Sequence, residues 1–509
     1  MLRLGNLGQG MRGRLRLLAG AAFVLWGSIA GLAAAAHADT LADAIALAYQ
    51  SNPTLQSQRA QLRALDESYV QARAGFRPQA NIQAQVAYAN GPSTLDVGVT
   101  SDSAALNLTQ PIYTGGLTSA QVRAAEGDIQ SGRQRLRQVE ATVLQSVIQA
   151  YVDVRRDQQA LAIAVENVKV LRRQLDETKA RFEVGQITRT DVAQAQARLA
   201  AAESQLSSAQ AQLGVSRANY VAVVGQSPGD LAAEPPLDGI PATVDQAFDT
   251  AAKNNPGILT ADFAEQAAAA RVAVAKAAYR PTLSLSAAVG YENSLTNAPL
   301  LGLQGGIYDH NVTAAATLTQ PLFAGGMNAS RIREALENDN AQRIAVELAQ
   351  RQAVQSVAQA WNQLLAARSS IASNQEQVHA DEVAYEGVRQ EADVGLRTTL
   401  DVLNAEQELR NAQLALVDAR HDQYVASAGV LSAMGLLEAK ALGNPVPIYD
   451  PDKSFHRIKH AGALPWDGVV AGLDSVGSPA IARRPTSADQ VRPAIEPVTP
   501  AQSGGAVMP

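Results

Sequence analysis

Four segments of this chain alternate between apolar and polar side chains, as expected for a β-strand with two different faces. In the segment QANIQAQVAYA the apolar positions are Ala80, Ile82, Ala84, Val86 and Tyr88. The pattern predicts strands over residues 79–89, 104–112, 282–291 and 311–321. Strands of about ten residues with this alternation are typical of transmembrane β-barrels. A soluble antiparallel sheet with one face in water has the same pattern.

Most of the remaining chain has the spacing of long helices. No proline occurs from Ile112 to Ser227, or from Leu322 to Asn444. A helix over 118–182 would be roughly 100 Å long. A Val-Gly pair ends each long helix, and TRTD or TTLD then starts a second one with the Thr-x-x-Asp form of a capping box. Each stretch is therefore predicted to be a helical hairpin. Its coiled-coil seam in the first stretch would consist of Leu144, Val147, Tyr151, Val154, Leu161, Val165, Val168 and Leu175.

The same order of elements occurs twice. SNP corresponds to NNP at an offset of 203 residues, from Pro53 to Pro256. LTQPIYTGG corresponds to LTQPLFAGG at an offset of 210 residues, from Pro111 to Pro321, and EVGQITRTDV corresponds to DVGLRTTLDV at the same offset. The chain is therefore expected to contain repeat 1 over 39–228, a linker over 229–241 and repeat 2 over 242–442.

The phrase LTQP-[IL]-[FY]-x-GG stands at each passage from a strand to a long helix. Its proline cannot donate to a sheet ladder and therefore suits the end of a strand. Its aromatic residue suits a membrane interface, and its two glycines permit a sharp turn into the helix. The phrase predicts two strand-to-helix joints, made by Pro111, Gly115 and Gly116 and by Pro321, Gly325 and Gly326.

Four strands are too few for a membrane barrel in one chain. An open sheet edge cannot face lipid, and the smallest closed barrels have eight strands. The chain must therefore form oligomers if its strands span a membrane. Two copies would give eight strands and three would give twelve, and only the wider barrel leaves room for a channel.

The ordered motifs resemble the TolC family, the outer membrane channel-tunnels of bacterial efflux and type I secretion, over nearly all of residues 40–440. The resemblance implies an all-α-dominated fold with membrane β: a long coiled-coil barrel plus a transmembrane β-barrel that forms only in the homotrimer. It also implies a passive exit duct in outer membrane lipid, which spans the outer membrane of a Gram-negative bacterium and projects into the periplasm. Such a duct docks to a periplasmic adaptor (membrane fusion) protein and an inner-membrane ABC or proton-driven transporter.

The resemblance assigns roles to residues at the helical tips. Asp401 and Asn404 match the family's pair of pore-ring aspartates, although Asn404 lacks the carboxylate. Arg397 matches a latch arginine, with Thr190 and Asp191 as its partners on the adjacent coil. Ala392 stands where a latch tyrosine is expected. As alternatives, Asp191 and Asp401 only cap their helices and Arg397 is only a solvated surface residue.

Composition narrows the function further. Net charge is −6 with no recurrent basic patch, so no nucleic acid partner is expected. The chain has no cysteine, which excludes thiolate metal sites and attachment of lipid through an N-terminal Cys. Six scattered histidines lack metal-ligand spacing, and no catalytic motif is present, so we expect neither cofactor nor enzymatic activity. The alternatives are a non-selective porin and a periplasmic coiled-coil adhesin, neither of which requires both the strands and the helices.

The two ends of the chain are expected to lie outside this fold. Four arginines, an apolar run and AHA predict a signal peptide over 1–38, cleaved after Ala38, and an uncleaved membrane anchor is the alternative. Residues 443–509 contain scattered prolines with little apolar periodicity and are predicted to be a disordered periplasmic tail. The sequence is compatible with export of either polypeptides or small molecules.

Overall fold

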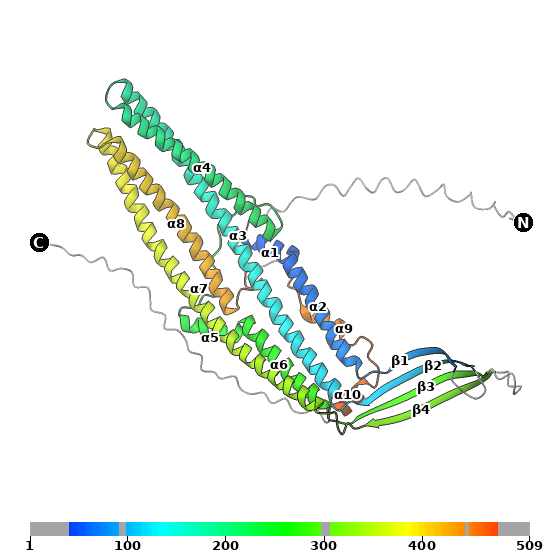
Figure 1. Ribbon diagram of the computed structural model, residues 1–509. Helices are drawn as coiled ribbons and strands as arrows, with labels where there is room; N and C mark the ends of the chain where they lie inside the picture. Colours follow the sequence, from blue (N-terminus) through cyan, green and yellow to red (C-terminus); the bar gives the residue numbers. More distant parts are fainter. Residues whose placement is uncertain (1–39, 91–97, 297–305, 443–446, 477–509) are drawn as a thin grey trace, which may run out of the picture.

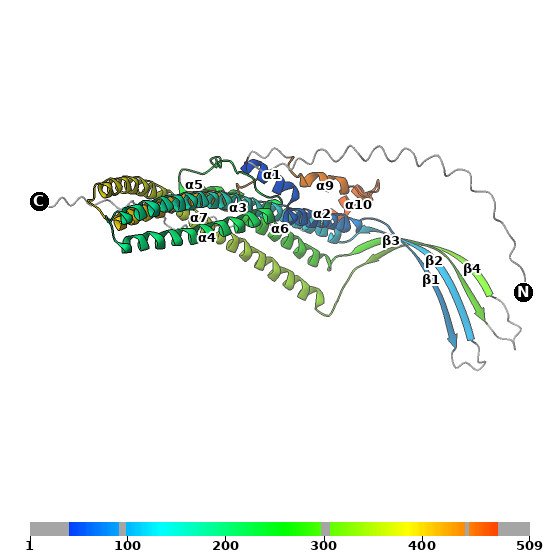
Figure 2. The same cartoon turned by 90° about the horizontal axis from the view of Figure 1, so that it is seen from above.

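The computed structural model describes residues 40–90, 98–296, 306–442 and 447–476. Two long helical hairpins lie side by side at one end of the molecule, and a sheet of strands leaves the other end (Figure 1). Seen from above, the sheet curves away from the axis of the helices (Figure 2). The predicted signal peptide and the tips between paired strands, around residues 91–97 and 297–305, lie outside the described residues.

Repeat 1 begins with two helices, continues with two strands and ends in the first hairpin. Its elements are α1 (Leu41–Ser51), α2 (Pro53–Ala74), β1 (Gln79–Asn90), β2 (Gly98–Tyr113), α3 (Leu117–Glu183) and α4 (Arg189–Val224). Helix α3 has 67 residues, so it is about 100 Å long, as the sequence predicts. Strand β2 is longer than predicted because it begins at Gly98 instead of residue 104.

Repeat 2 has the same elements with the same lengths of helix. They are α5 (Val244–Asn254), α6 (Pro256–Ala277), β3 (Thr282–Thr296), β4 (Gly306–Thr319), α7 (Met327–Asp393) and α8 (Thr399–Met434). Helices α3 and α7 have 67 residues each, and α4 and α8 have 36 residues each. The duplication read from the sequence is therefore a duplication of structure.

The described strands form one antiparallel sheet in the order β1-β2-β3-β4. Its register aligns Ile82 with Leu106, Leu106 with Val289, and Val289 with Val312. These four side chains form an apolar row across the whole sheet, and they are 77, 50, 55 and 77% exposed. The neighbouring row, Asn81, Asn107, Ala288 and Thr313, is mostly polar and lies on the opposite face. An exposed apolar face with a polar face behind it is what a membrane strand needs.

The main core lies where α1 and α5 meet the middle of the long helices. Leu144, Val147, Tyr151 and Val154 of the predicted seam are fully buried there. Toward the tip of the hairpin the core becomes a small cluster that includes Val168, Leu171 and Leu403. Val165 is 49% exposed, so the seam is not continuous at that position.

The C-terminal segment corrects the sequence prediction, because part of the expected disordered tail is folded. Within 443–509, the described residues form α9 (Pro451–Ile458) and α10 (Asp467–Ser475). Helix α9 packs on α2, and α10 packs on β2 and α3 (Figure 1). We call residues 447–476 the C-terminal strap. Two short helices among scattered prolines give too little periodicity to be recognised, and pairwise polar contacts with repeat 1 hold them in place.

No helix in the described ranges has both the length and the hydropathy needed to cross a membrane.

Candidate functional site: the helical tips and the strand-to-helix joints

The tips of both hairpins contain the same capping box. The Thr188 hydroxyl accepts from the amide of Asp191, and the Asp191 carboxylate accepts from the amide of Thr188 at 2.9 Å. Thr398 and Asp401 repeat this arrangement, with the Asp401 carboxylate 3.0 Å from the Thr398 amide. Hydrogen bonds from the Thr398 amide and hydroxyl lower the pKa of Asp401. Asp191 and Asp401 therefore both cap a helix, and Asp401 also keeps its negative charge.

Arg397 contacts a residue of its own hairpin. Its Nε lies 2.8 Å from Oε2 of Glu391, and this hydrogen bond raises the pKa of the guanidinium. Asp191, the partner that the family resemblance implies, binds Thr188 within the described chain. Thr190 is exposed beside it. A contact between Arg397 and Asp191 is therefore not made within one chain, and it stays a prediction for neighbouring subunits.

Two polar contacts that the sequence did not predict join the hairpins near their tips. Arg181 of α3 lies 3.4 Å from Asp393 of α7, with both side chains partly exposed. Arg198 of α4 donates to the side-chain oxygen of Asn404 at 3.0 Å. Asn404 thus contacts the other hairpin through the amide that replaces the family's carboxylate. These contacts can be broken without exposing a core, because they lie at the surface.

The strand-to-helix joints show why both copies of the phrase contain glutamine. Gln110 donates from Nε2 to the carbonyl oxygens of Phe76 and Pro111, at 2.9 and 2.7 Å. Gln320 donates in the same way to Tyr279 and Pro321, at 3.1 and 3.0 Å. The glutamine therefore ties the end of the second strand to the residue before the Arg-Pro pair. This role was not predicted from the sequence, although the repetition of the glutamine was a usable signal.

The glycine pairs adopt the conformation that the phrase predicts. Gly115 and Gly116 have φ of 71° and 84°, and Gly325 and Gly326 have φ of 58° and 84°. Left-handed backbone of this kind strains residues that have a Cβ atom. The prolines end the regular pairing: β2 has a register irregularity between Pro111 and Tyr113, and β4 ends at Thr319, just before Pro321.

The C-terminal strap completes the joint of repeat 1. Asp474 is fully buried, and its carboxylate accepts from the amides of Thr114, Gly116 and Ser119 at 2.7 to 3.1 Å. Burial raises the pKa of Asp474, but the hydrogen bonds from Thr114, Ser119 and Gly116 outweigh it, so the pKa is lowered. The ionised carboxylate caps α3, whose own N-cap residue is a glycine without a capping side chain.

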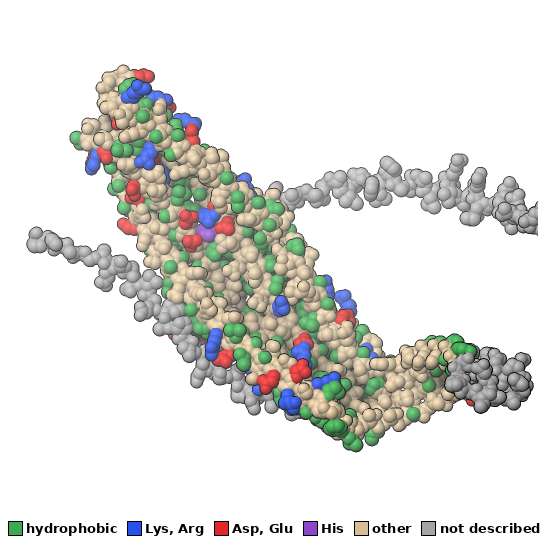
Figure 3. All heavy atoms as spheres, in the orientation of Figure 1, with side chains coloured by type: hydrophobic (Ala, Val, Ile, Leu, Met, Phe, Trp, Pro, Cys, Tyr) green, Lys and Arg blue, Asp and Glu red, His purple; other side chains and the backbone are tan. Residues whose placement is uncertain are grey.

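A histidine joins the two hairpins at mid-height. His421 of α8 lies 2.8 Å from Asp153 of α3 and 2.9 Å from Asp422. Burial lowers the pKa of His421, but the hydrogen bonds to the two aspartates outweigh it and the pKa is raised. Figure 3 shows charged side chains around mid-height and near the tips, and few over the strands. No local pattern predicts this contact, because its partners are 268 residues apart.

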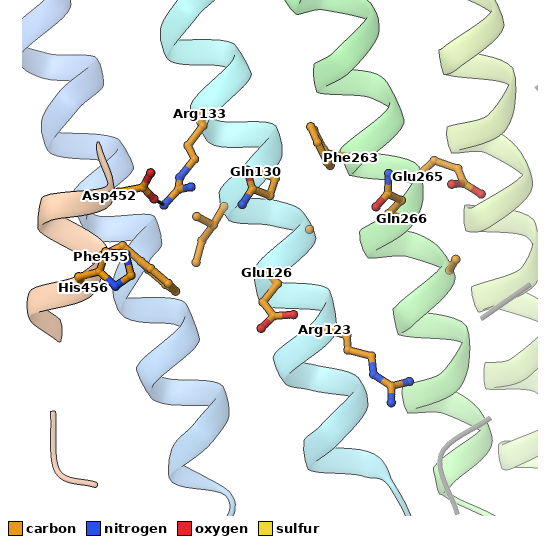
Figure 4. Close-up of a pocket in the computed structure, with 13 residues that line it drawn as sticks. Arg123, Glu126, Gln130, Arg133, Phe263, Glu265, Gln266, Asp452, Phe455 and His456 are labelled. Carbon is orange, nitrogen blue, oxygen red and sulfur yellow. Dashed lines mark ion pairs between the residues drawn. The ribbon is translucent and has the colours of Figure 1, made fainter. Parts of the chain in front are cut away.

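A groove of about 590 Å³ lies where the strap crosses repeat 1, between α3, α6 and α9. Arg133 reaches Asp452 across it at 2.7 Å, and Phe455 and Phe263 lie on its two sides (Figure 4). Glu126 faces the groove, and burial raises the pKa of its carboxyl. The charged groups that line the groove are of both signs, so the groove has no clear preference for a cation or an anion.

The sequence is similar to known proteins over both repeats of the fold. The sequence profile of the family described as "Outer membrane efflux protein" matches residues 44–226 and 247–436, which correspond to the two repeats. The chain is 34% identical to Outer membrane efflux protein BepC of Brucella suis biovar 1 (strain 1330) over 426 residues, 84% of this chain and 91% of that protein. It is 29% identical to Outer membrane protein TolC of Escherichia coli (strain K12) over 431 residues, 82% of this chain and 86% of that protein.

Among solved structures, the fold is similar to that of the outer membrane protein VceC from Vibrio cholerae. The TM-score is 0.66 at 23% identity, and the match covers 78% of this chain and 96% of VceC.

Proposed function

The chain belongs to the outer membrane efflux protein family, and we propose that three copies of it form one continuous duct that docks to a periplasmic adaptor and an inner-membrane transporter. The protein is an outer membrane exit duct of a Gram-negative efflux or secretion system. The family forms channels and is not a family of enzymes. The duct is passive, and the transporter supplies the energy. The ordered motifs of the sequence support the same assignment.

The observation that best supports a trimer is the open four-stranded sheet. Strands β1 and β4 each have one edge without a partner strand among the described residues. The apolar face of the sheet is exposed, so the natural surroundings of that face are lipid. An unpaired edge is not tolerated in lipid, so further copies must close the sheet. Three copies give a twelve-stranded barrel, which is wide enough to contain a channel.

The helical tips are proposed to close the periplasmic mouth. Arg181 with Asp393 and Arg198 with Asn404 hold the second hairpin against the first in each protomer. Arg397 is proposed to bind Asp191 and Thr190 of a neighbouring coil when the mouth is closed. Asp401 from three subunits would form a ring of carboxylates, with Asn404 beside it, at the narrowest point.

The proposal is tested by the mass of the detergent-solubilised protein. Multi-angle light scattering should give the mass of a trimer after subtraction of the detergent, and single molecules in planar bilayers should conduct. A stable monomer with fully formed strands would overturn the proposed duct. A conducting trimer that binds no periplasmic adaptor in pull-down experiments from its own host would instead favour the porin alternative.

A further inference from the structure

Only one of the two strand-to-helix joints is complete within a single chain. In repeat 1 the carbonyl oxygen of Gly115 accepts from Nη1 of Arg280 at 3.2 Å. The backbone there is so close that a Cβ atom on Gly115 would lie 2.8 Å from the Cβ of Arg280. In repeat 2 a Cβ atom on Gly325 would meet no described atom within 4 Å, and Phe323 is 91% exposed. The second joint therefore lacks the partner that the first one has.

The internal duplication identifies the missing partner. Arg280 directly precedes β3, and its counterpart in repeat 1 is Arg77, which directly precedes β1. Arg77 and Gly325 lie at opposite edges of the sheet, since β1 and β4 are its outer strands. They can therefore meet only between two copies of the chain. Arg77 uses Nε for Asp467 of the strap, and its buried Nη2 atom has no hydrogen-bond partner in the described ranges.

We propose that a second copy of this chain completes the joint of repeat 2, with Arg77 of the partner subunit donating to the carbonyl oxygen of Gly325. This inference rests on the proposed trimeric duct and assigns its subunit contacts. Each subunit then supplies one arginine to its own joint and one to its neighbour's joint. Around the ring, each strand-to-helix joint then receives an arginine, and among the described residues only the joints of repeat 1 also contact the strap.

The same duplication fixes the register of the strands between subunits. Within the chain Leu106 of β2 aligns with Val289 of β3. The corresponding pair is Ala316 of β4 with Val86 of the partner subunit's β1. Both belong to the apolar face of their strands, so the apolar face continues across the subunit boundary. A slip by one residue would place Val86 of the partner subunit on the polar face.

The helices give an independent reason for the same contact. Helix α3 packs against α2 on one side and α6 on the other, and a Cβ atom on Gly127 would lie 2.9 Å from Ala267 of α6. Helix α7 packs against α6, and among the described residues no helix on its other side corresponds to the second helix that α3 has. Apolar side chains of α7 are left exposed, namely Met327, Leu336, Ile344 and Leu348. By the duplication, α2 of the partner subunit covers this surface.

Disulfide crosslinking tests the register, because the natural chain has no cysteine. Asn107 aligns with Ala288 within the chain, so Thr317 should align with Gln85 of the partner subunit. The double variant Gln85→Cys with Thr317→Cys should form covalent multimers on mild oxidation, since directly opposed residues come within disulfide reach. The matched control is Gln85→Cys with Thr313→Cys, whose two positions lie on the same face but about 13 Å out of register.

The protein could be a trimer in light scattering and yet crosslink equally through both pairs, or only through the control pair. That result would overturn the proposed register but not the proposed duct. A monomer in light scattering would overturn the duct as well. The double variant is also analysed without oxidant, which shows whether it still assembles.

Substitution of Arg77 tests the joint itself. Arg77→Gln should lower the temperature at which the trimer dissociates in SDS. Asp467→Asn is the control, because it removes the negative charge that Arg77 binds in the strap and leaves Arg77 itself unchanged. Arg280→Gln should destabilise each protomer at the joint of repeat 1 without a specific loss of trimer. If Arg77→Gln and Asp467→Asn lower the dissociation temperature equally, Arg77 acts only through the strap and the proposed contact with Gly325 is wrong.

Discussion

Asp474 accepts a hydrogen bond from the amide of Gly116 at 3.1 Å, although 358 residues separate them in the chain. The contact places a buried carboxylate at the N-terminus of α3, directly where β2 turns into the long helix. The C-terminal strap therefore binds the backbone at the turn from β2 into α3 in repeat 1. No residue of the described chain does the same for Gly326 in repeat 2, where a Cβ atom would meet only open space.

Asp474→Ala should destabilise the joint of repeat 1. The substitution leaves the buried amide of Gly116 and the partly buried amide of Ser119 without an acceptor, which we expect to cost about 2 kcal/mol of unfolding free energy. Thermal unfolding in detergent, followed by circular dichroism, measures the loss, and limited proteolysis should release the strap. Asp452→Ala is the control, because Asp452 binds Arg133 at the surface and its side chain is 56% exposed. Equal effects of the two variants would contradict the capping role of Asp474.

The contact between His421 and Asp153 should make the packing of the two hairpins depend on pH. The pKa of His421 is raised in the folded protein, so the contact stabilises fully below the unfolded pKa of about 6.5 and its contribution is lost as pH rises through the folded pKa. His421→Gln should therefore lower the unfolding temperature at pH 6 more than at pH 9. His379→Gln, at an exposed position on α7, should leave the pH dependence unchanged. A His421→Gln variant with the wild-type pH profile would exclude this coupling.

Glu406 should destabilise the second hairpin above neutral pH. It is 3% exposed, and burial raises its pKa to about 7. The folded state then binds a proton more tightly than the unfolded state, so stability falls as pH rises from about 4.5 to 7. Glu406→Gln should raise the unfolding free energy at pH 8 by about 2 kcal/mol and flatten its pH dependence. Glu408→Gln, at an exposed position two residues away, should do neither.

Asp401 and Asp191 form a matched pair for testing the pore ring. Both cap a helix through the same box, with Thr398 and Thr188. If Asp401 also lines the constriction, Asp401→Ala should weaken cation selectivity and block by multivalent cations in planar bilayers. Asp191→Ala should lose the cap to the same extent but keep the selectivity. Identical reversal potentials for both variants and the wild type would leave Asp401 as a helix cap only.

Arg397 should restrain the closed mouth through Asp191 of a neighbouring coil. Arg397→Ala is therefore expected to raise single-channel conductance, and Asp191→Asn should raise it as well. Glu391→Gln separates this role from the local one, because Glu391 is the residue that Arg397 binds within its own hairpin. A rise in conductance for Glu391→Gln without a rise for Asp191→Asn would place the restraint inside one hairpin instead.

Much of the fold could be predicted from the sequence, because it is encoded at short range. Alternation over ten residues, helical spacing and the Thr-x-x-Asp caps each depend on neighbours within one turn or one strand. The long helices α3 and α7 end within one residue of the predicted break, and the joints have the positive φ that their glycines require. The duplication was visible because its motifs keep their order and offsets.

What the sequence could not determine were the contacts between residues far apart in the chain. The pairing of Asp474 with Gly116, of His421 with Asp153 and of Arg198 with Asn404 depends on which helices lie side by side. The disordered tail was wrongly predicted for the same reason: α9 and α10 are held by polar partners in repeat 1, which local composition does not reveal. Sequence determined the elements and their repetition, since these follow from local periodicity. Tertiary structure alone decided that repeat 1 has a complete joint and repeat 2 does not, because that difference arises from what packs against each glycine pair.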